Sequence, residues 1–123
     1  MERLKPHKKL KLWTEAMNLV SCLYQISKDF PREEDYGLKA QIRRAAISVP
    51  SNMSEGLTRK SGKDRYHFLN IAQASLSEID AQVEIARRLD YIDESVESKL
   101  NDALSMVERL LSGLMRSIKE RAC

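Results

Sequence analysis

The residues with the clearest chemical potential are basic side chains between positions 59 and 65. The segment TRKSGKDR carries Arg59, Lys60, Lys63 and Arg65, interrupted by a single acid. Counted from Tyr36 onward, this part of the chain has a local excess of about five positive charges. Guanidinium and ammonium groups bind phosphate oxygens through charge-assisted hydrogen bonds. The spacing therefore predicts a binding site for a polyanion.

Residues 1–9 form a second basic region, which we interpret as an N-terminal arm. The predicted phosphate-binding residues are Lys8 and Lys9 of this arm, Lys11 just after it, and Arg59, Lys60, Lys63 and Arg65 of the basic turn. Tyr66 follows the basic turn and could stack on a base. The sequence contains no zinc finger, helix-turn-helix or RNA-binding signature, so any recognition would be of shape and phosphate instead of base sequence.

Enzymatic chemistry has little support in the sequence. His67 follows Asp64 at the i, i+3 spacing of a di-iron bundle motif, but such a site requires a second unit, and the only other histidine is His7. A nucleophilic triad, a glycine-rich phosphate loop and a Cys/His zinc set are missing. We therefore predict a non-enzymatic protein with no metal and no cofactor, in which His67 lies at the surface or between helices.

Composition favours one all-α domain covering residues 1–123. Charged residues make up 32% and hydrophobic residues 42%, with 4 glycines and 3 prolines, a balance typical of amphipathic helices. The two cysteines, Cys22 and Cys123, give no disulfide or metal spacing, which favours a cytoplasmic location. We find no secretion signal and no membrane-spanning stretch, so no membrane partner is expected. The net charge is only +3, so any electrostatic function depends on how charge is arranged.

Hydrophobic periodicity predicts four helices. The first runs from about Leu10 to Asp29, and the second starts near Tyr36. The third is entered from a turn at residues 57–64, where Ser61 and Asp64 have the spacing of a capping box, and the fourth begins after Asp93, which can cap it. Short connections imply an antiparallel up-down-up-down four-helix bundle. Pro50 lies inside the second helix, where it removes a backbone hydrogen bond, so we expect a kink there.

The predicted core faces follow three- and four-residue steps. On the first helix the predicted face is Trp13, Met17, Val20, Leu23, Tyr24 and Ser27. On the second it is Leu38, Ile42, Ala45, Ala46, Val49, Met53 and Leu57. The third and fourth helices have similar stripes, so all four helices are expected to share one core.

This topology predicts that basic groups gather at one end of the bundle. In an up-down-up-down arrangement the turn near residue 60 and both chain termini lie at the same end. Arg116, Lys119 and Arg121 are expected there as well, while the opposite end receives acids from residues 33–35 and 90–94. Repetition of one basic end in a symmetric oligomer would multiply the phosphate contacts.

Several segments resemble the four-helix-bundle proteins encoded within 23S ribosomal RNA intervening sequences. The strongest is QIRRAAISVPSNMSEG at positions 41–56, followed by the basic turn. Further segments are HKKLKLWTEAM at 7–17, FPREEDYGL at 30–38 and FLNIAQASLSEIDAQVEIARRLDYI at 68–92. A more distant similarity connects the chain to the accessory variability determinant of diversity-generating retroelements. The resemblance implies a bacterial protein that forms a homo-oligomeric ring, a pentamer, with a role in nucleic-acid binding.

The resemblance also draws attention to four polar residues that match positions of the family's motifs: Arg44, Asn52, Glu55 and Glu78. Arg44 and Glu78 could form a bidentate pair between neighbouring helices or at a subunit contact. We favour a structural or interface network over a ligand site, and both interpretations stay open.

Two functions are compatible with the sequence. In the first, a homo-oligomeric bundle presents a basic end to RNA or DNA. In the second, a homo-oligomeric scaffold binds a protein partner, such as a reverse transcriptase or another enzyme, without contacting nucleic acid.

Overall fold

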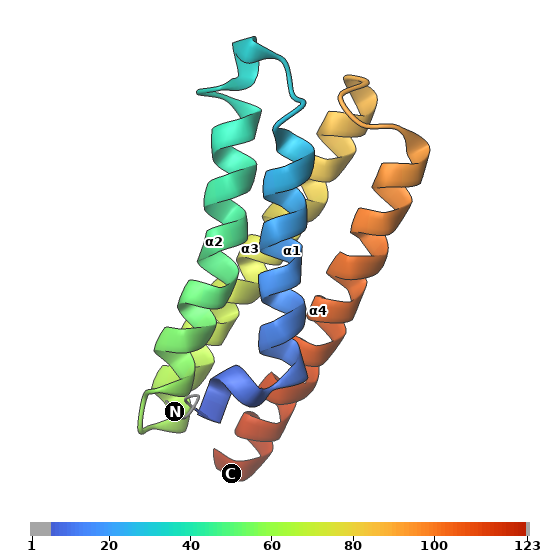
Figure 1. Ribbon diagram of the computed structural model, residues 1–123. Coiled ribbons are helices and arrows are strands. Elements are labelled where there is room, and N and C mark those ends of the chain that lie inside the picture. Colours follow the sequence, from blue (N-terminus) through green and yellow to red (C-terminus); the bar gives the residue numbers. More distant parts are fainter. Residues whose placement is uncertain (1–5, 123) are drawn as a thin grey trace, which may run out of the picture.

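The computed structural model describes residues 6–122, and in this range every regular element is helical. The elements are a 3₁₀ turn η1 (Pro6–Lys9), α1 (Lys11–Ser27), a 3₁₀ turn η2 (Arg32–Glu34), α2 (Leu38–Leu57), α3 (Gly62–Arg88) and α4 (Glu94–Ala122). Figure 1 shows the four α-helices running alternately up and down the bundle. Each helix packs against the next, and α1 also packs against α4. The predicted all-α four-helix bundle is confirmed.

Side-chain caps define where the long helices begin. Ser61 Oγ accepts a hydrogen bond from the Asp64 backbone N–H at 3.1 Å, as the capping pattern predicts, and Asp93 Oδ1 accepts one from the Val96 N–H at 2.9 Å. These bonds satisfy backbone donors that the first helical turn leaves without a partner. Both starts agree with the predicted boundaries.

The end of α3 has a feature that the sequence did not indicate. Asp90 adopts a positive φ of 61°, the Tyr91 N–H donates to the Ala86 carbonyl at 2.9 Å, and the Asp90 N–H donates to the Arg87 carbonyl at 3.1 Å. This bond pattern is a Schellman motif, which usually has glycine at the left-handed position. Aspartate tolerates that conformation better than most residues, so the helix ends here without a glycine.

The core lies between all four helices. Its fully buried large side chains are Leu19, Leu23, Ile42, Met53, Leu69, Leu76, Ile79, Leu100, Leu104, Leu111, Val49 and Val83. The predicted face of α2 is confirmed from Leu38 to Met53, and Leu57 packs against the core while partly exposed. α2 continues through Pro50 as one helix, and a kink at that position stays a prediction.

The predicted core face of α1 is confirmed at Leu23 and Ser27 but is wrong by one position at Trp13, Met17 and Val20. The buried residues of this helix are Leu12, Ala16, Leu19, Leu23 and Ser27. Trp13 and Val20 are only partly buried, and Met17 is 41% exposed. Helix α1 has apolar residues on two adjacent stripes, and the bundle buries the one that includes Leu12. The other stripe lies at the edge of the bundle, where it borders α2.

Candidate nucleic-acid interface

Three parts of the chain that are distant in sequence meet at one end of the bundle. Figure 1 places the start of α1, the turn between α2 and α3, and the end of α4 together at the bottom of the molecule. Two contacts support this view: His7 Nε2 lies 3.5 Å from Ser54 Oγ, and Lys63 and Lys119 line the same pocket. We call this end the basic pole. Its exposed cations are Lys8, Lys11, Arg59, Lys60, Lys63, Arg116 and Lys119.

Two of the predicted phosphate-binding arginines have structural contacts in the turn. Arg59 forms an ion pair with Glu55 at 2.8 Å, and its guanidinium lies 4.7 Å from the centre of the Phe68 ring. Arg65 Nε donates to the Arg59 carbonyl at 2.7 Å and is half-buried. These contacts hold the turn against the start of α3. The two arginines therefore contribute to the shape of the pole as well as to its charge.

The lysines of the basic pole are different. Lys60, Lys63 and Lys119 are exposed, and within residues 6–122 none of them forms an ion pair or a side-chain hydrogen bond. The same holds for Lys8 and Lys11. Residues 1–5 of the predicted arm and the side chains of Lys9 and Arg121 lie outside the described residues, and residues 6–9 of the arm form η1.

At the opposite end, three cations are paired with acids, whereas Lys28, Arg32 and Lys99 are exposed and have no ion pair within residues 6–122. Lys39 Nζ lies 3.4 Å from Asp35, Arg87 contacts Asp90 at 3.7 Å and Glu97 at 3.8 Å, and Arg88 contacts Glu84 at 3.1 Å. Among the described residues this half of the bundle thus contains four of the five ion pairs, and the basic pole contains one. The two ends differ in how much of their positive charge is locally neutralised.

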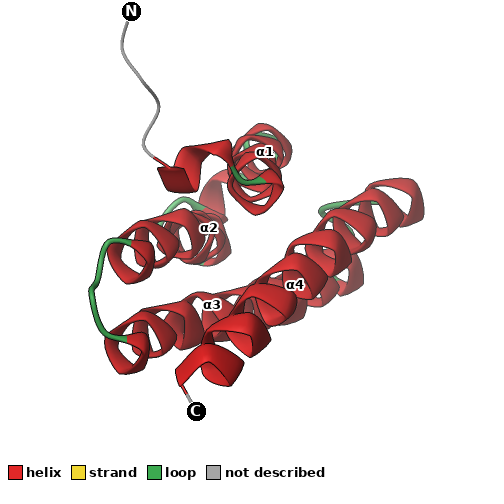
Figure 2. Cartoon of the chain, turned by 90° about the horizontal axis from the view of Figure 1, so that it is seen from below, coloured by secondary structure: helices red, strands yellow, loops and turns green. Residues whose placement is uncertain are grey.

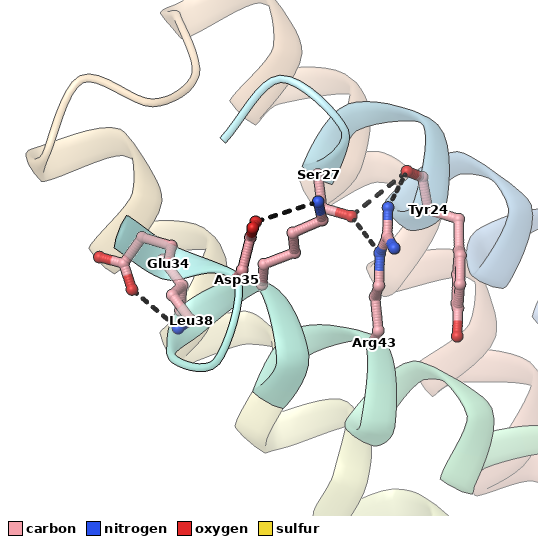
Figure 3. Close-up of polar contacts among 7 residues, drawn as sticks. Tyr24, Ser27, Glu34, Asp35, Leu38 and Arg43 are labelled. Atoms are coloured by element: carbon pink, nitrogen blue, oxygen red, sulfur yellow. Dashed lines mark hydrogen bonds and ion pairs between the residues drawn. The ribbon is translucent and has the colours of Figure 1, made fainter. Parts of the chain in front are cut away.

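Arg43 also belongs to the opposite end, where it closes the last turn of α1 (Figure 3). Its Nε donates to Ser27 Oγ at 2.8 Å, its Nη2 donates to the Tyr24 carbonyl at 3.0 Å, and its guanidinium lies 4.4 Å from the centre of the Tyr24 ring. A cation near a helix C-terminus satisfies free carbonyls and complements the helix dipole. We conclude that Arg43 is a structural residue.

The four residues singled out by the family resemblance do not form one network. Asn52 Nδ2 donates to the Ser48 carbonyl at 2.9 Å and to Ser48 Oγ at 3.0 Å. Glu55 pairs with the arginine four residues later, and Arg44 and Glu78 are exposed, with no ion pair between them among residues 6–122. A role of Arg44 and Glu78 at a subunit contact stays a prediction.

The polar contact between α2 and α3 is made by serines that the motif comparison did not include. Ser48 Oγ and Ser75 Oγ lie 2.8 Å apart, and Asn52 completes this cluster. The sequence held part of the signal, because Ser48 and Asn52 lie one turn apart on α2 and Ser75 lies in line with the apolar residues Ala72 and Ile79 of α3. This cluster links the two helices and helps to fix their register.

Neither a metal site nor a membrane-spanning helix is present among residues 6–122. Residues 6–122 contain no group of three or more His, Cys, Asp or Glu side chains that could hold a metal ion. His67 is exposed and contacts the Phe68 ring, with the ring centres 5.2 Å apart, as expected for a surface residue. In the same range, no helix has the length and hydropathy needed to cross a lipid bilayer.

An apolar groove between α1 and α2 was not anticipated. It is a hollow of about 480 Å³ lined by Trp13, Met17, Val20, Ile47, Pro50, Ser51, Ser54 and Glu55. Met17 and Ile47 are 41% and 45% exposed. Trp13, Met17 and Val20, which the sequence pattern assigns to the core, line this groove instead.

Comparison with known proteins gives a family and a fold. The model of the family described as 23S rRNA-intervening sequence protein matches residues 8–113. No curated protein matches the chain. Among solved structures, a protein of unknown function from the S23 ribosomal protein family of Bacteroides thetaiotaomicron VPI-5482 superposes with a TM-score of 0.79 at 21% identity. The similarity covers 85% of this chain and 95% of that one, and at this identity it concerns the fold alone.

Proposed function

Because the chain belongs to the 23S rRNA-intervening sequence protein family, as the sequence resemblance predicted, we propose that it is a non-enzymatic, RNA-associated accessory protein of the cytoplasm. It forms a homo-oligomer and binds the phosphate backbone through its basic pole. The observation that supports this proposal is the unequal pairing of charge. The five described lysines at the basic pole are exposed and unpaired within residues 6–122, whereas three of the cations at the other end, Lys39, Arg87 and Arg88, are held by neighbouring acids.

Assembly matters to this proposal because one pole makes few phosphate contacts. Each contact to duplex nucleic acid contributes about 0.9 to the slope of log affinity against log salt concentration, and each contact to a single strand about 0.7. A protomer with a handful of lysines would therefore bind weakly at physiological salt. A ring that repeats the pole, the predicted pentamer for example, gains avidity because the contacts are linked.

The test is the salt dependence of RNA binding by two matched charge-reversal variants. The first carries Lys60→Glu, Lys63→Glu and Lys119→Glu at the basic pole, and the second carries Lys28→Glu, Arg32→Glu and Lys99→Glu, which are exposed and lie nearer the opposite end. Arg59 and Arg65 are left intact because they hold the turn together. Fluorescence anisotropy of a labelled random-sequence RNA is measured from low to moderate salt.

We expect the first variant to bind more weakly and to lose about 1 from the salt slope for every lysine that contacts phosphate. The second variant has the same net charge as the first and is expected to keep the wild-type slope. Equal losses in both variants would show that only the total charge matters. Wild-type binding that is absent at low salt would contradict the proposal as a whole.

A second candidate function has its own observation, the apolar groove between α1 and α2. Exposed apolar residues that line a groove are typical of protein–protein contacts. We propose that the occupant is a second copy of this chain, so that the groove forms the subunit contact of the homo-oligomer. The alternative function, a scaffold for a protein partner, would use the same assembly without nucleic acid.

Light scattering coupled to size-exclusion chromatography tests this contact. The double variant Met17→Glu and Ile47→Glu is expected to reduce the mass of the particle, because two carboxylates cannot be buried in an apolar contact without a partner. Ile85→Glu and Leu89→Glu, which change exposed apolar residues of α3, are the control. An unchanged mass for the groove variant would place the subunit contact elsewhere. An absorbance ratio at 260 and 280 nm across the same peak reports any bound RNA and separates the two functions.

A further inference from the structure

The basic pole contains a pocket of about 270 Å³ between the beginning of α3 and the end of α4. Gly62, Lys63 and Tyr66 line it from α3, and Ile118 and Lys119 line it from α4. Figures 1 and 2 both show these helix ends side by side. The pocket exists only in the folded chain, because its two halves are more than fifty residues apart in the sequence.

The lining of this pocket combines apolar and cationic side chains. Tyr66 and Ile118 supply an aromatic ring and an aliphatic wall, and these side chains are 36% and 8% exposed. Lys63 and Lys119 are exposed and come from opposite sides of the pocket, one from each helix. Neither lysine has an ion pair among the described residues, so both are available to an anion. The pocket therefore combines a flat apolar surface with two positive charges.

Size limits what this pocket can hold. Its volume lies just below the range of about 300–1,000 Å³ that is typical of sites for drug-sized ligands and cofactors. One planar ring system fits this description better than a dinucleotide. A ligand with a planar ring and a phosphate on either side of it matches both the apolar wall and the paired lysines.

We propose that this pocket seats one unstacked base of a single-stranded nucleic acid, with the ring of Tyr66 against the base and the Lys63 and Lys119 ammonium groups on the flanking phosphates. This inference rests on the proposed function and adds to it a preference for single-stranded over double-stranded nucleic acid. Bases of a duplex are paired and stacked, so they cannot enter the pocket without being pulled out of the helix. A protein that contacts phosphate alone has no reason to prefer single strands, whereas one with a base seat does.

The experiment compares a labelled 12-nucleotide single-stranded RNA of random sequence with the 12-base-pair duplex of the same composition at one salt concentration. Tyr66→Ala removes the ring, Tyr66→Phe keeps it without the hydroxyl, and Tyr36→Ala removes an aromatic residue that is 99% exposed and lies away from the basic pole. Far-UV circular dichroism and melting of each variant establish that the bundle is folded.

We expect Tyr66→Ala to weaken single-strand binding about 5- to 150-fold, the range for loss of one base–aromatic stack, without changing the salt slope. Duplex binding by the same variant should stay within about two-fold of wild type, and Tyr66→Phe and Tyr36→Ala should bind both RNAs as wild type does. The lysine variant Lys63→Glu and Lys119→Glu should reduce the salt slope, as phosphate contacts require.

Three results would overturn the base seat. In the first, wild-type protein binds RNA in a salt-dependent manner but Tyr66→Ala binds the single strand equally well, which leaves the proposed function intact. In the second, Tyr66→Ala weakens duplex and single strand to the same extent. In the third, adenosine monophosphate competes as effectively as the oligonucleotide, which would make the pocket a site for a free nucleotide. Absence of any wild-type RNA binding would refute the proposed function and the base seat together.

Discussion

Glu34 shows how a single side chain connects separate elements at the end of the bundle opposite the basic pole. Its Oε1 accepts a hydrogen bond from the Leu38 backbone N–H at 2.9 Å, and its Oε2 accepts one from the Tyr91 hydroxyl at 2.8 Å. The first bond caps the start of α2, and the second ties η2 to the turn between α3 and α4. The bond from Leu38 and then that from Tyr91 lower the pKa of Glu34. The hydrogen bond to Glu34 is the main cause that raises the pKa of Tyr91 to about 12.

These opposite pKa shifts predict a pH window for the contribution of this contact to stability. The lowered pKa of Glu34 means that its contribution is present above its ordinary pKa of 4.5 and is lost as the pH falls through the folded-state value. The raised pKa of Tyr91 means that its contribution is present below 10 and is lost as the pH rises through about 12. Tyr91→Phe should therefore lower the melting temperature at neutral pH. The difference from wild type should shrink towards both extremes.

Tyr36→Phe is the matched control, because Tyr36 is 99% exposed and forms no hydrogen bond in the described part of the chain. Its melting temperature should follow wild type across the same pH series. A difference between Tyr91→Phe and wild type that persists unchanged above pH 12 would show that the hydroxyl contributes through packing and not through Glu34.

Gln82 gives a second prediction at the level of one residue. It lies on α3, is only 5% exposed, and its Oε1 accepts no hydrogen bond from the residues described. A buried polar atom without a partner costs about 1–3 kcal/mol, and removing the polar group avoids that cost. Gln82→Met, which keeps the length of the side chain, should raise the free energy of unfolding by about 1 kcal/mol in urea titrations.

Gln73 on the same helix serves as the comparison for Gln82. Its Nε2 donates to Ser112 Oγ at 3.2 Å. Gln73→Met therefore removes a hydrogen bond, whereas Gln82→Met removes an oxygen that has no hydrogen-bond partner among the described residues. The same chemical change should lower stability by about 0.5–1.5 kcal/mol at position 73. If Gln82→Met destabilises the protein to a similar degree, a buried water or a subunit contact satisfies Gln82 in solution.

At the level of elements, prediction from the sequence succeeded where one apolar stripe had no competitor. The face of α2 from Leu38 to Met53 and the caps at Ser61 and Asp93 were read correctly because spacing and residue type point to a single solution. The first half of the α1 face was wrong because Leu12 and Trp13 begin two adjacent apolar stripes, whereas Leu23 and Ser27 were placed correctly. Only packing against the other helices decides which stripe is buried.

The candidate site likewise has parts that the sequence predicts and parts that only the structure shows. The basic turn was visible in the sequence as a charge cluster, but the structural contacts of Arg59 and Arg65 and the pocket beside Tyr66 were not. The ion pair between Arg59 and Glu55, four residues apart, is a local pattern that a sequence can show. The position of the Arg59 guanidinium above the Phe68 ring and the pocket shared by Gly62 and Ile118 depend on tertiary geometry. Sequence periodicity identifies which residues share a face, but not which faces meet.

Gly56 gives a prediction for the packing of α2 against α3 at the basic pole. A Cβ at this position would lie 3.0 Å from the Arg65 carbonyl oxygen, 3.1 Å from Phe68 Cβ and 3.3 Å from Leu69 Cγ. The nearest of these atoms belongs to the backbone, which cannot move without shifting the start of α3. Gly56→Ala should therefore lower stability by about 1–3 kcal/mol, partly offset by about 1 kcal/mol of helix propensity.

Gly113→Ala measures the effect of helix propensity without a steric clash, because no atom of another residue lies within 4 Å of a Cβ at that position in α4. This variant should raise stability by about 0.5–1 kcal/mol. Opposite signs for the two glycines in chemical denaturation would confirm that Gly56 is required for close helix approach. A stabilising Gly56→Ala would show that the α2–α3 contact opens without cost.

At the level of the whole molecule, the arrangement of charge matters more than its sum. The net charge is +3, which is unremarkable for 123 residues. Yet five exposed lysines that have no ion pair within residues 6–122 gather where α1 and α3 begin and α4 ends, while Lys39, Arg87 and Arg88 at the other end are paired with acids. A chain with this distribution attracts polyanions at one end only, and its field there is stronger than the total suggests.

A variant that moves charge but keeps the net charge constant separates the effect of charge arrangement from the effect of net charge. Lys60→Glu and Lys63→Glu remove four units of charge from the pole, and Asp80→Lys with Asp102→Lys restores four units at exposed positions on the sides of α3 and α4. If arrangement governs binding, this fourfold variant should lose most of the salt-dependent RNA affinity of wild type although its net charge is still +3.

The double variant Asp80→Lys and Asp102→Lys provides the converse measurement, since it raises the net charge by four without altering the pole. Screening limits exposed charges to about 10 Å at 0.1 M salt, so these lysines should add little to phosphate contacts made at the pole. We expect its salt slope, measured by anisotropy, to equal that of wild type. Tighter binding with a steeper slope would mean that RNA also contacts the sides of the bundle, because only additional phosphate contacts release additional counterions.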